Sequence, residues 1–236
     1  MLLAIWRPWR VSHDRDAWKL AIVFGVALAA MNLLFYSSLD RIPLGPAVTF
    51  EFVGPLAVAL FASRTRLDLL WVALAATGIL LLAGPGGSDD MLGIALALGA
   101  GGCWGAYILI SARVGQAFSG GQGLAIAMAI GAGLMVAPGV AVGGEALLEP
   151  EVIAIGAAVA LLSSVIPYSF ELEALRTIPV GVFGVLMSLE PAVAALAGLI
   201  AIDQGLNAAE VAGIALVVAA SAGVLRRPGA AAPRDA

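Results

Sequence analysis

The chain has 236 residues, of which 61% are hydrophobic and 12% are charged, and its mean hydropathy is +1.03. A soluble fold of this length has too little interior to hide so much apolar surface, so the composition excludes a soluble domain and predicts an integral membrane protein. The net charge of -4, with no basic patch, argues against a nucleic-acid partner.

The first ten residues, MLLAIWRPWR, run from apolar side chains straight into charge. They are too short to cross a bilayer, and they lack the basic start and the apolar core of a signal peptide. We interpret them as the end of a helix whose beginning is absent from the chain.

Crossing the hydrocarbon core takes about 20 apolar residues in a helix. Eight apolar runs near that length are bounded by charged residues, glycine or proline. They cover residues 20–38, 42–62, 69–84, 91–112, 121–142, 152–171, 179–202 and 208–225. Because the intervening segments are short, we expect one all-α integral membrane domain with eight full transmembrane helices and an N-terminal stump.

The basic residues predict the orientation of these spans. Of the 12 Lys and Arg residues, all but Arg41 precede the first span or follow the second, fourth, sixth or eighth. Cytoplasmic loops carry such an excess of Lys and Arg. The pattern therefore places both chain termini in the cytoplasm and supports the count of eight spans.

An internal repeat links the second and seventh spans. LDRIPLG at residues 39–45 is echoed by LRTIPVG at residues 175–181, and Pro55 matches Pro191 at the same offset of 136. The first copy starts outside the membrane and the second starts inside, so the two units are antiparallel, as in inverted-repeat transporters. Such units can rock around a shared site that opens to either side in turn.

The repeat also predicts a larger architecture. If each unit has five helices, a complete relative has ten, and this chain lacks the first and most of the second. We expect residues 1–90 to form an incomplete first half, residues 91–225 the second half, and residues 226–236 a disordered cytoplasmic tail. A misplaced start and a real truncation both account for the missing helices.

Two carboxylates lie near the centres of predicted spans. Glu51 and Glu190 would each cost roughly 2.5 to 3.5 kcal/mol on insertion scales, so each needs a compensating interaction. A carboxyl group kept neutral by desolvation can exchange a proton or meet the ammonium group of a substrate. The alternative is a protonated side chain that is bonded to a neighbouring helix for packing alone.

Three prolines interrupt the helical pattern close to these and other polar residues: Pro55, Pro167 and Pro191. Each frees a backbone carbonyl and can kink its helix, which exposes polar groups to a cavity. A tolerated kink without a ligand is the other interpretation.

Further polar and aromatic side chains fall within spans. Asn32 and Tyr36 share a helix face, and Ser164 and Tyr168 are their candidate counterparts in the second half. We predict that these four residues contact substrate, although such side chains often only join helices, at about 0.6 kcal/mol each.

Two aromatic residues stand beside a GxxxG motif. Trp104 and Tyr107 are candidates to line a cavity, with packing or lipid contact as the alternative. Gly101 and Gly105 form the motif, and small residues at this spacing allow helices to approach closely.

Taken in order, the segments MNLLFYSSLDRIPLG, EFVGPLAVALFASR, LALGAGGCWGAYIL, IPYSFELEAL and GVLMSLEPAVAALAG resemble the EamA branch of the drug/metabolite transporter superfamily. Within that branch the chain is similar to bacterial inner-membrane threonine and homoserine exporters, over residues 1–225. The resemblance implies ten helices in two inverted five-helix halves, and proton-coupled efflux of small amino acids through a central cavity. Asp203 and Gln204 depart from the family, where Gly-Glu is frequent.

Amino-acid export is one of several functions that the sequence allows. An exporter of other metabolites or drugs and an inactive truncated remnant are the alternatives. A membrane-embedded enzyme is disfavoured because no predicted span contains a histidine and HExxH is absent. We expect no cofactor and no metal, and the absence of a nucleotide-binding loop argues against ATP as the energy source. Partners are the bilayer, a small amino acid and protons, and assembly into a homodimer is left open.

Overall fold

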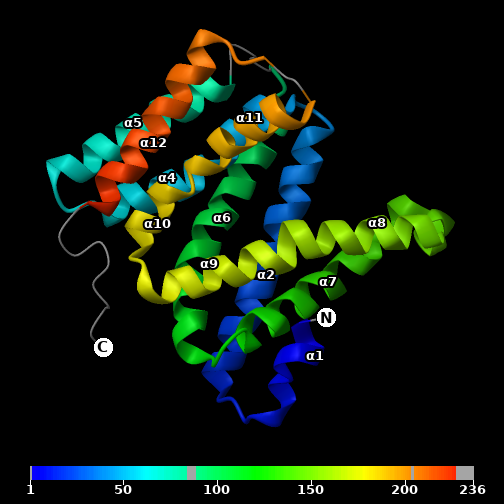
Figure 1. Ribbon diagram of the computed structural model, residues 1–236. Coiled ribbons are helices and arrows are strands. Elements are labelled where there is room, and N and C mark those ends of the chain that lie inside the picture. Colours follow the sequence, from blue (N-terminus) through cyan, green and yellow to red (C-terminus); the bar gives the residue numbers. More distant parts are fainter. Residues whose placement is uncertain (1, 84–88, 203–204, 227–236) are drawn as a thin grey trace. The chain divides into compact units, whose positions relative to one another are not determined.

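The computed structural model of the chain describes residues 2–83, 89–202 and 205–226. Within these ranges the regular elements are all helices (Figure 1). Eight helical segments are long and apolar enough to cross a membrane, and each overlaps one predicted span in the same order. The predicted all-α class and the predicted eight spans are therefore confirmed. Asp203, Gln204 and the predicted tail from residue 227 lie outside the described residues.

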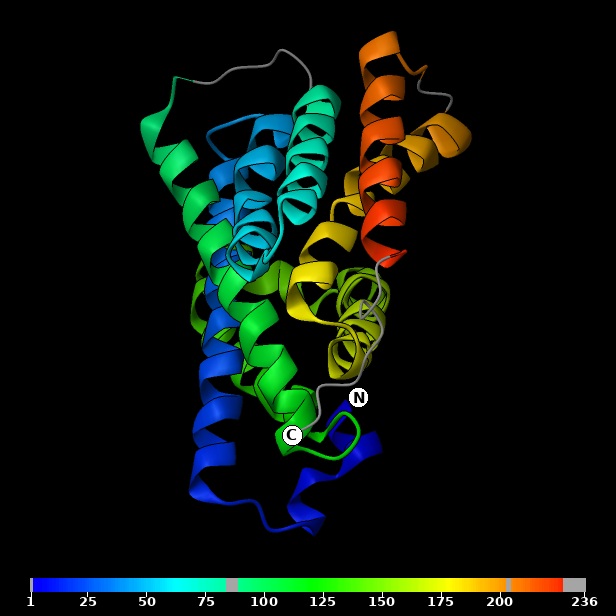
Figure 2. The ribbon, with the colours of Figure 1, turned by 90° about the vertical axis from the view of Figure 1, so that its left-hand side faces the viewer.

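Four of the eight segments are uninterrupted helices. They are α2 (Arg15–Leu39), α5 (Arg66–Ala83), α6 (Met91–Ala117) and α12 (Ala208–Leu225). Figure 2 shows α2 and α6 as long, continuous ribbons. Side chains fix where these helices begin: Asp14 accepts the Ala17 amide at 2.6 Å before α2, and Asn207 and Glu210 form a capping box on α12.

The other four segments are each built from more than one element. In chain order these are α3 (Leu44–Glu51) with α4 (Val53–Ala62); α7 (Gln122–Gly143) with the 3-10 turn η2 (Gly144–Leu148); α8 (Pro150–Ala160), the π-helical turn η3 (Leu161–Val165) and α9 (Ile166–Thr177); and α10 (Val180–Leu186) with α11 (Leu189–Ile202). Before them, the stump is α1 (Leu2–Trp6), followed by the 3-10 turn η1 (Pro8–Arg10).

The repeat recurs in the helix boundaries. α3 begins at Leu44 and α10 begins at Val180, while α4 begins at Val53 and α11 begins at Leu189, and both pairs are 136 residues apart. α5 and α12 are both 18 residues long. The sparse sequence matches thus mark two stretches of chain that break and resume their helices at equivalent residues.

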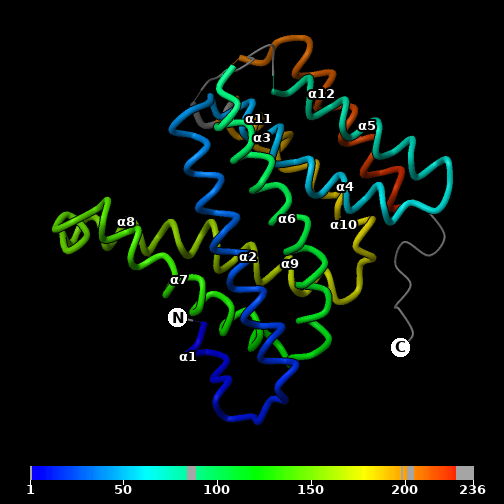
Figure 3. Tube along the Cα trace, turned by 180° about the vertical axis from the view of Figure 1, so that it is seen from behind, coloured from blue at the N-terminus to red at the C-terminus, as the bar shows by residue number. Residues whose placement is uncertain are grey.

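The chain divides into two compact units, one of residues 1–29 and 110–176 and the other of residues 30–109 and 177–236. In the second unit α5 packs along α12 (Figure 3) and α4 packs along α10. Glycines allow the α5–α12 contact, because a Cβ on Gly78 would lie 2.8 Å from the Gly213 carbonyl oxygen. Each unit holds segments from both expected halves, so the compact units and the repeat halves divide the chain differently.

The first unit joins the stump to α7 and the loop before it. α1 packs against α7, and the Trp6 indole lies so close to Gly121 that a Cβ there would be 2.5 Å from the indole nitrogen. Arg176, at the end of α9, donates to the carbonyl oxygens of Phe118, at 3.0 Å, and Gly120. Its guanidinium also pairs with Glu173 at 2.9 Å.

Candidate functional site

Glu51 is the last residue of α3, at a break in the second span. Pro55 lacks the N–H that would bond to the Glu51 carbonyl in a continuous helix, so the helical ladder is interrupted here. Phe52 bridges the break, because its N–H bonds to the Val48 carbonyl at 3.0 Å and its own carbonyl accepts the Leu56 N–H at 3.1 Å. The carboxyl group therefore stands at a helix end in the middle of the span.

Glu190 occupies the equivalent break in the seventh span. It is the second residue of α11, which begins after the turn at residues 187–188, and it directly precedes Pro191. Its N–H bonds to the Met187 carbonyl at 3.0 Å, which closes the turn. Both central carboxylates thus lie where a transmembrane helix is interrupted.

Both carboxyl groups lie in the second unit, on the two interrupted spans that pack against one another through α4 and α10. Glu51 is half-buried and Glu190 is exposed. Within the part of the chain that the structure describes, neither forms an ion pair with a basic side chain. A proton or a cationic ligand can therefore neutralise the charge of these two intramembrane acids.

Glycines on α6 hold the first break in place. A Cβ on Gly101 would lie 2.5 Å from the Glu51 carbonyl oxygen, and a Cβ on Gly54 would overlap the Gly101 carbonyl oxygen. Gly105, one turn further on, faces the Gly54 carbonyl oxygen, which would lie 3.3 Å from an added Cβ. The predicted close approach at the GxxxG motif is confirmed, and its partner is the helix that carries Glu51.

Glycines on α10 approach the same helix from the second repeat. A Cβ on Gly184 would lie 2.5 Å from the Pro55 carbonyl oxygen, and a Cβ on Gly181 would lie 2.7 Å from the Ala62 Cβ. The two interrupted spans therefore meet almost backbone to backbone, which fixes α4 and α10 relative to one another.

The two predicted aromatic residues occupy different settings. Trp104 is 7% exposed and packs edge-on against Phe52, with ring centroids 4.8 Å apart. It therefore borders the residue next to Glu51. Tyr107 is fully buried and has an interaction partner, so it belongs to the packed interior of the helices. Phe52 was missed from sequence, and the signal that could have found it is its position between Glu51 and Pro55.

Asn32 and Tyr36 lie on α2, in the same unit as the carboxyl pair. Asn32 is half-buried and has an interaction partner. Tyr36 is 62% exposed, and its ring contacts Phe35 with a centroid distance of 5.8 Å. Tyr36 is thus the more accessible of the two.

Ser164, Pro167 and Tyr168 belong to the other unit. Ser164 lies in the π-helical turn η3, and Pro167 and Tyr168 lie in the first turn of α9. All three are half-buried. The helix widens immediately before Pro167, which is how a chain accommodates a proline without ending the span.

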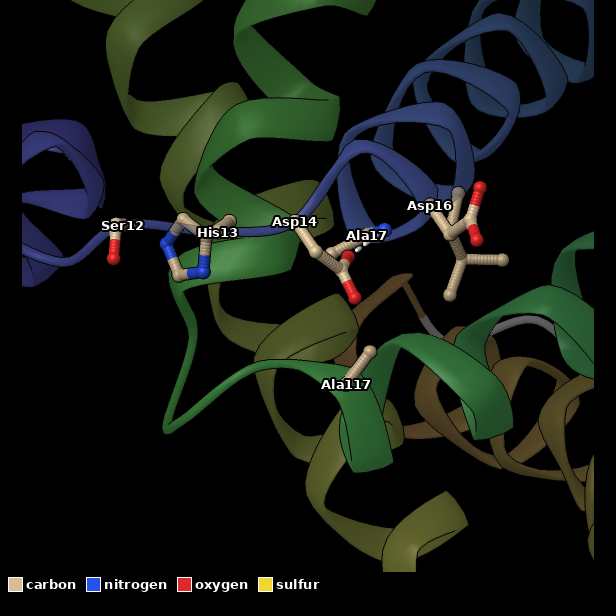
Figure 4. A pocket seen from close by; sticks show the side chains of 7 residues that line it. Ser12, His13, Asp14, Asp16, Ala17 and Ala117 are labelled. Carbon is tan, nitrogen blue, oxygen red and sulfur yellow. Dashed lines mark hydrogen bonds between the residues drawn. The ribbon is translucent and has the colours of Figure 1, made fainter.

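None of the predicted site residues lines either of two further cavities. One, of about 630 Å³, lies near the start of α2 and is lined by Ser12, His13, Asp14, Asp16, Ala17, Leu20 and Ala117 (Figure 4). The other, also about 630 Å³, lies at the loop between α2 and α3 and is lined by Ser37, Asp40, Arg41, Asp90, Leu92 and Leu96.

Comparisons with known proteins place the chain among membrane carriers. Residues 91–226 match the EamA-like transporter family. The threonine/homoserine exporter RhtA of Escherichia coli (strain K12) is 44% identical over 227 residues, covering 94% of this chain and 76% of that protein. The protein of the same name from Salmonella typhimurium (strain LT2) is 42% identical over the same length and coverage.

A solved crystal structure shares the fold. It matches with a TM-score of 0.76 at 17% identity, over 88% of this chain and 76% of the other. Together with the eight membrane-length helices, these similarities show that the chain is a multi-pass membrane transporter that belongs to the EamA-like transporter family.

Proposed function

We propose that the chain exports small amino acids, threonine and homoserine among them, across the bacterial inner membrane. The names of the two RhtA relatives support this substrate class. The observation that carries the proposal is that Glu51 and Glu190 stand at equivalent helix breaks, in two spans that pack against one another through α4 and α10.

Proton coupling follows from the surroundings of this pair. A carboxyl group in the bilayer interior favours its neutral form, and two that interact favour holding at least one proton between them. The ammonium group of an amino acid can replace that proton as the compensating charge. Substrate and proton would then compete for one site, so that inward proton movement drives outward substrate movement.

Alternating access is the movement that such a site requires. Each expected half contributes one helix of the repeated pair, and the breaks in this pair recur at the same offset. We propose that residues 1–90 and 91–225 act as the two inverted halves of a ten-helix arrangement and rock about the α4–α10 contact. Asn32, Tyr36, Trp104, Ser164 and Tyr168 are proposed to contact substrate, Tyr107 to support them, and Pro55, Pro167 and Pro191 to keep the helices interrupted.

The test is efflux from cells that express the chain and are preloaded with labelled threonine. We expect Glu51→Gln and Glu190→Gln each to lower the efflux rate by about 10- to 100-fold, the range for losing a hydrogen bond to a charged group. Glu145→Gln, an exposed acid in η2, is the matched control and should export at the parental rate. Parental efflux in both central variants, at equal amounts in the membrane, would refute the proposal.

A second assay addresses coupling and substrate. In vesicles that contain a pH-sensitive dye, adding threonine should move protons through the parental chain and not through Glu51→Gln. A panel of amino acids and unrelated metabolites, assayed in the same vesicles, separates an amino-acid exporter from a carrier of other compounds. Equal dye responses in the parental chain and in Glu51→Gln would exclude proton coupling at Glu51.

A further inference from the structure

The cavity at the loop between α2 and α3 combines charges of both signs. Arg41 lies in the loop between these helices, and Asp90 lies just before α6. Their side chains form an ion pair, with Arg41 Nη1 3.3 Å from Asp90 Oδ2. Arg41 is also the single basic residue that the charge pattern assigns to the outer side of the membrane.

Both carboxylate oxygens of Asp90 already bond to groups of the protein. Its Oδ1 accepts the Gly93 N–H at 2.9 Å, which caps the N-terminus of α6, and its Oδ2 accepts from Arg41. Arg41 uses one of its five guanidinium donors in this pair. The remaining donors are available to a ligand that enters the cavity.

Two other polar side chains in the cavity lining have no such bonds. Asp40 and Ser37 line it, and in the described residues neither side chain bonds to another group. Leu92 and Leu96 form its apolar side. A lone anion would face two carboxylates here, and a lone cation would face a guanidinium. A ligand that carries both charges matches the lining.

We propose that this cavity binds the zwitterionic head group of an α-amino acid on the outer face of the membrane. The ligand carboxylate pairs with the Arg41 guanidinium, and the ligand ammonium pairs with Asp40, while Ser37 supplies a hydroxyl. The identity of the ligand rests on the proposed export function. The ligand carboxylate uses donors that Asp90 leaves free, but both anions share one positive charge, so Asp90 weakens the pairing of the ligand with Arg41.

The volume of the cavity fits this assignment. It is an open depression of about 630 Å³, which is ample for one α-amino acid. An amino acid with a short side chain fills only part of it, which leaves room for water and for fast release. Such a site is suited to the last stage of export, where tight binding would slow release.

The test measures access to the cavity and needs no transport. Leu92→Cys, in a Cys103→Ser background, places a single thiol in the lining for a membrane-impermeant maleimide added outside intact cells. External L-threonine should slow labelling at least about threefold, and the concentration required should rise about tenfold or more in Arg41→Gln and Asp40→Asn. Threonine methyl ester, a cation, and N-acetylthreonine, an anion, should not protect.

Two further variants sharpen the result. Asp90→Asn removes the competitor for Arg41 and should lower the protecting concentration of threonine, whereas Asp89→Asn, the exposed neighbour outside the lining, should leave it unchanged. Labelling that is insensitive to threonine, equal protection by ester or acetylated analogue, or undiminished protection in Arg41→Gln would each overturn the assignment. Protection without efflux would instead count against the export function alone.

Discussion

Gly101 and Gly102 are neighbours on α6 with opposite surroundings. An added Cβ at Gly101 would lie 2.5 Å from the Glu51 carbonyl oxygen, whereas at Gly102 nothing lies within 4 Å. A contact that close to backbone forces a shift of a whole helix, since the obstructing atom cannot rotate away. The position of Glu51 in the membrane is therefore set by the absence of a side chain on another helix.

This pair gives a matched prediction. Gly101→Ala should destabilise the chain by about 1–3 kcal/mol through overpacking and should lower efflux. Gly102→Ala should be neutral or stabilising by roughly 0.5–1 kcal/mol, because alanine favours the helix. Thermal unfolding in detergent or nanodiscs, followed by circular dichroism, measures both. Equal melting temperatures for the two variants would contradict the packing described at Glu51.

The charge of Asp90 is expected to make the stability of the fold depend on pH. The Gly93 amide and then the Arg41 guanidinium hold the pKa of Asp90 below its ordinary value. A depressed folded-state pKa stabilises the fold above the unfolded pKa, and this contribution is lost as pH falls through the folded pKa.

The parental chain should therefore melt at a higher temperature than Asp90→Asn at pH 7. The difference should close only below the ordinary aspartate pKa of about 3.9. Asp89→Asn, also measured across this range, should not differ from the parent. A gap between parent and Asp90→Asn that is independent of pH would show that the charge of Asp90 is not what stabilises α6.

At the scale of elements, the interrupted helices explain which parts of the site could be predicted from sequence. Pro55, Pro191 and the two carboxylates are visible in the sequence because a charge and a proline are both rare in the middle of an apolar run. The edge-on contact of Phe52 with Trp104 depends on how two helices cross, and an apolar residue in an apolar run carries no signal of it. Tyr107 was a cavity candidate as an aromatic residue in mid-span, with packing as the alternative, and the structure buries it fully.

The contact between the end of α9 and the loop before α7 is expected to stabilise the fold. Arg176 donates to two carbonyl oxygens just beyond the C-terminus of α6, where a cation also complements the helix dipole. Arg176→Gln should lower the stability of the chain by about 1–2 kcal/mol, within the range for a charged hydrogen bond. Arg113→Gln, an exposed arginine on α6, is the control and should melt like the parent in the same scan. An unchanged melting temperature for Arg176→Gln would mean that these bonds add nothing to the fold.

At the scale of the whole molecule, hydropathy alone predicted the eight spans because the bilayer requires every spanning helix to satisfy its own backbone and to be apolar. The repeat was predicted from a few collinear sequence matches, and the starts of α3 and α10 and of α4 and α11 recur at the same offset. The two compact units could not be predicted, because they depend on which helices touch, and apolar surfaces in lipid do not specify their partners.

The charge pattern also predicts which side of the membrane each loop faces. Single cysteines that replace Leu92 and Ser119 in a Cys103→Ser background should be labelled from opposite sides of the membrane, Leu92→Cys from outside and Ser119→Cys from the cytoplasm. The positive-inside rule gives the direction. Labelling of both positions from the same side would contradict a membrane-spanning α6, and labelling from the reversed sides would contradict the predicted orientation.

Every residue from 151 to 160 of α8 is exposed, and the helix packs chiefly against its own neighbours in sequence, η2 and η3. Acyl chains, rather than other helices, would then shield its amide groups. The folded state of this stretch would depend on its solvent, and hydrogen–deuterium exchange should reveal that dependence: slow uptake in a nanodisc, and the earliest uptake of any span once detergent replaces the lipid.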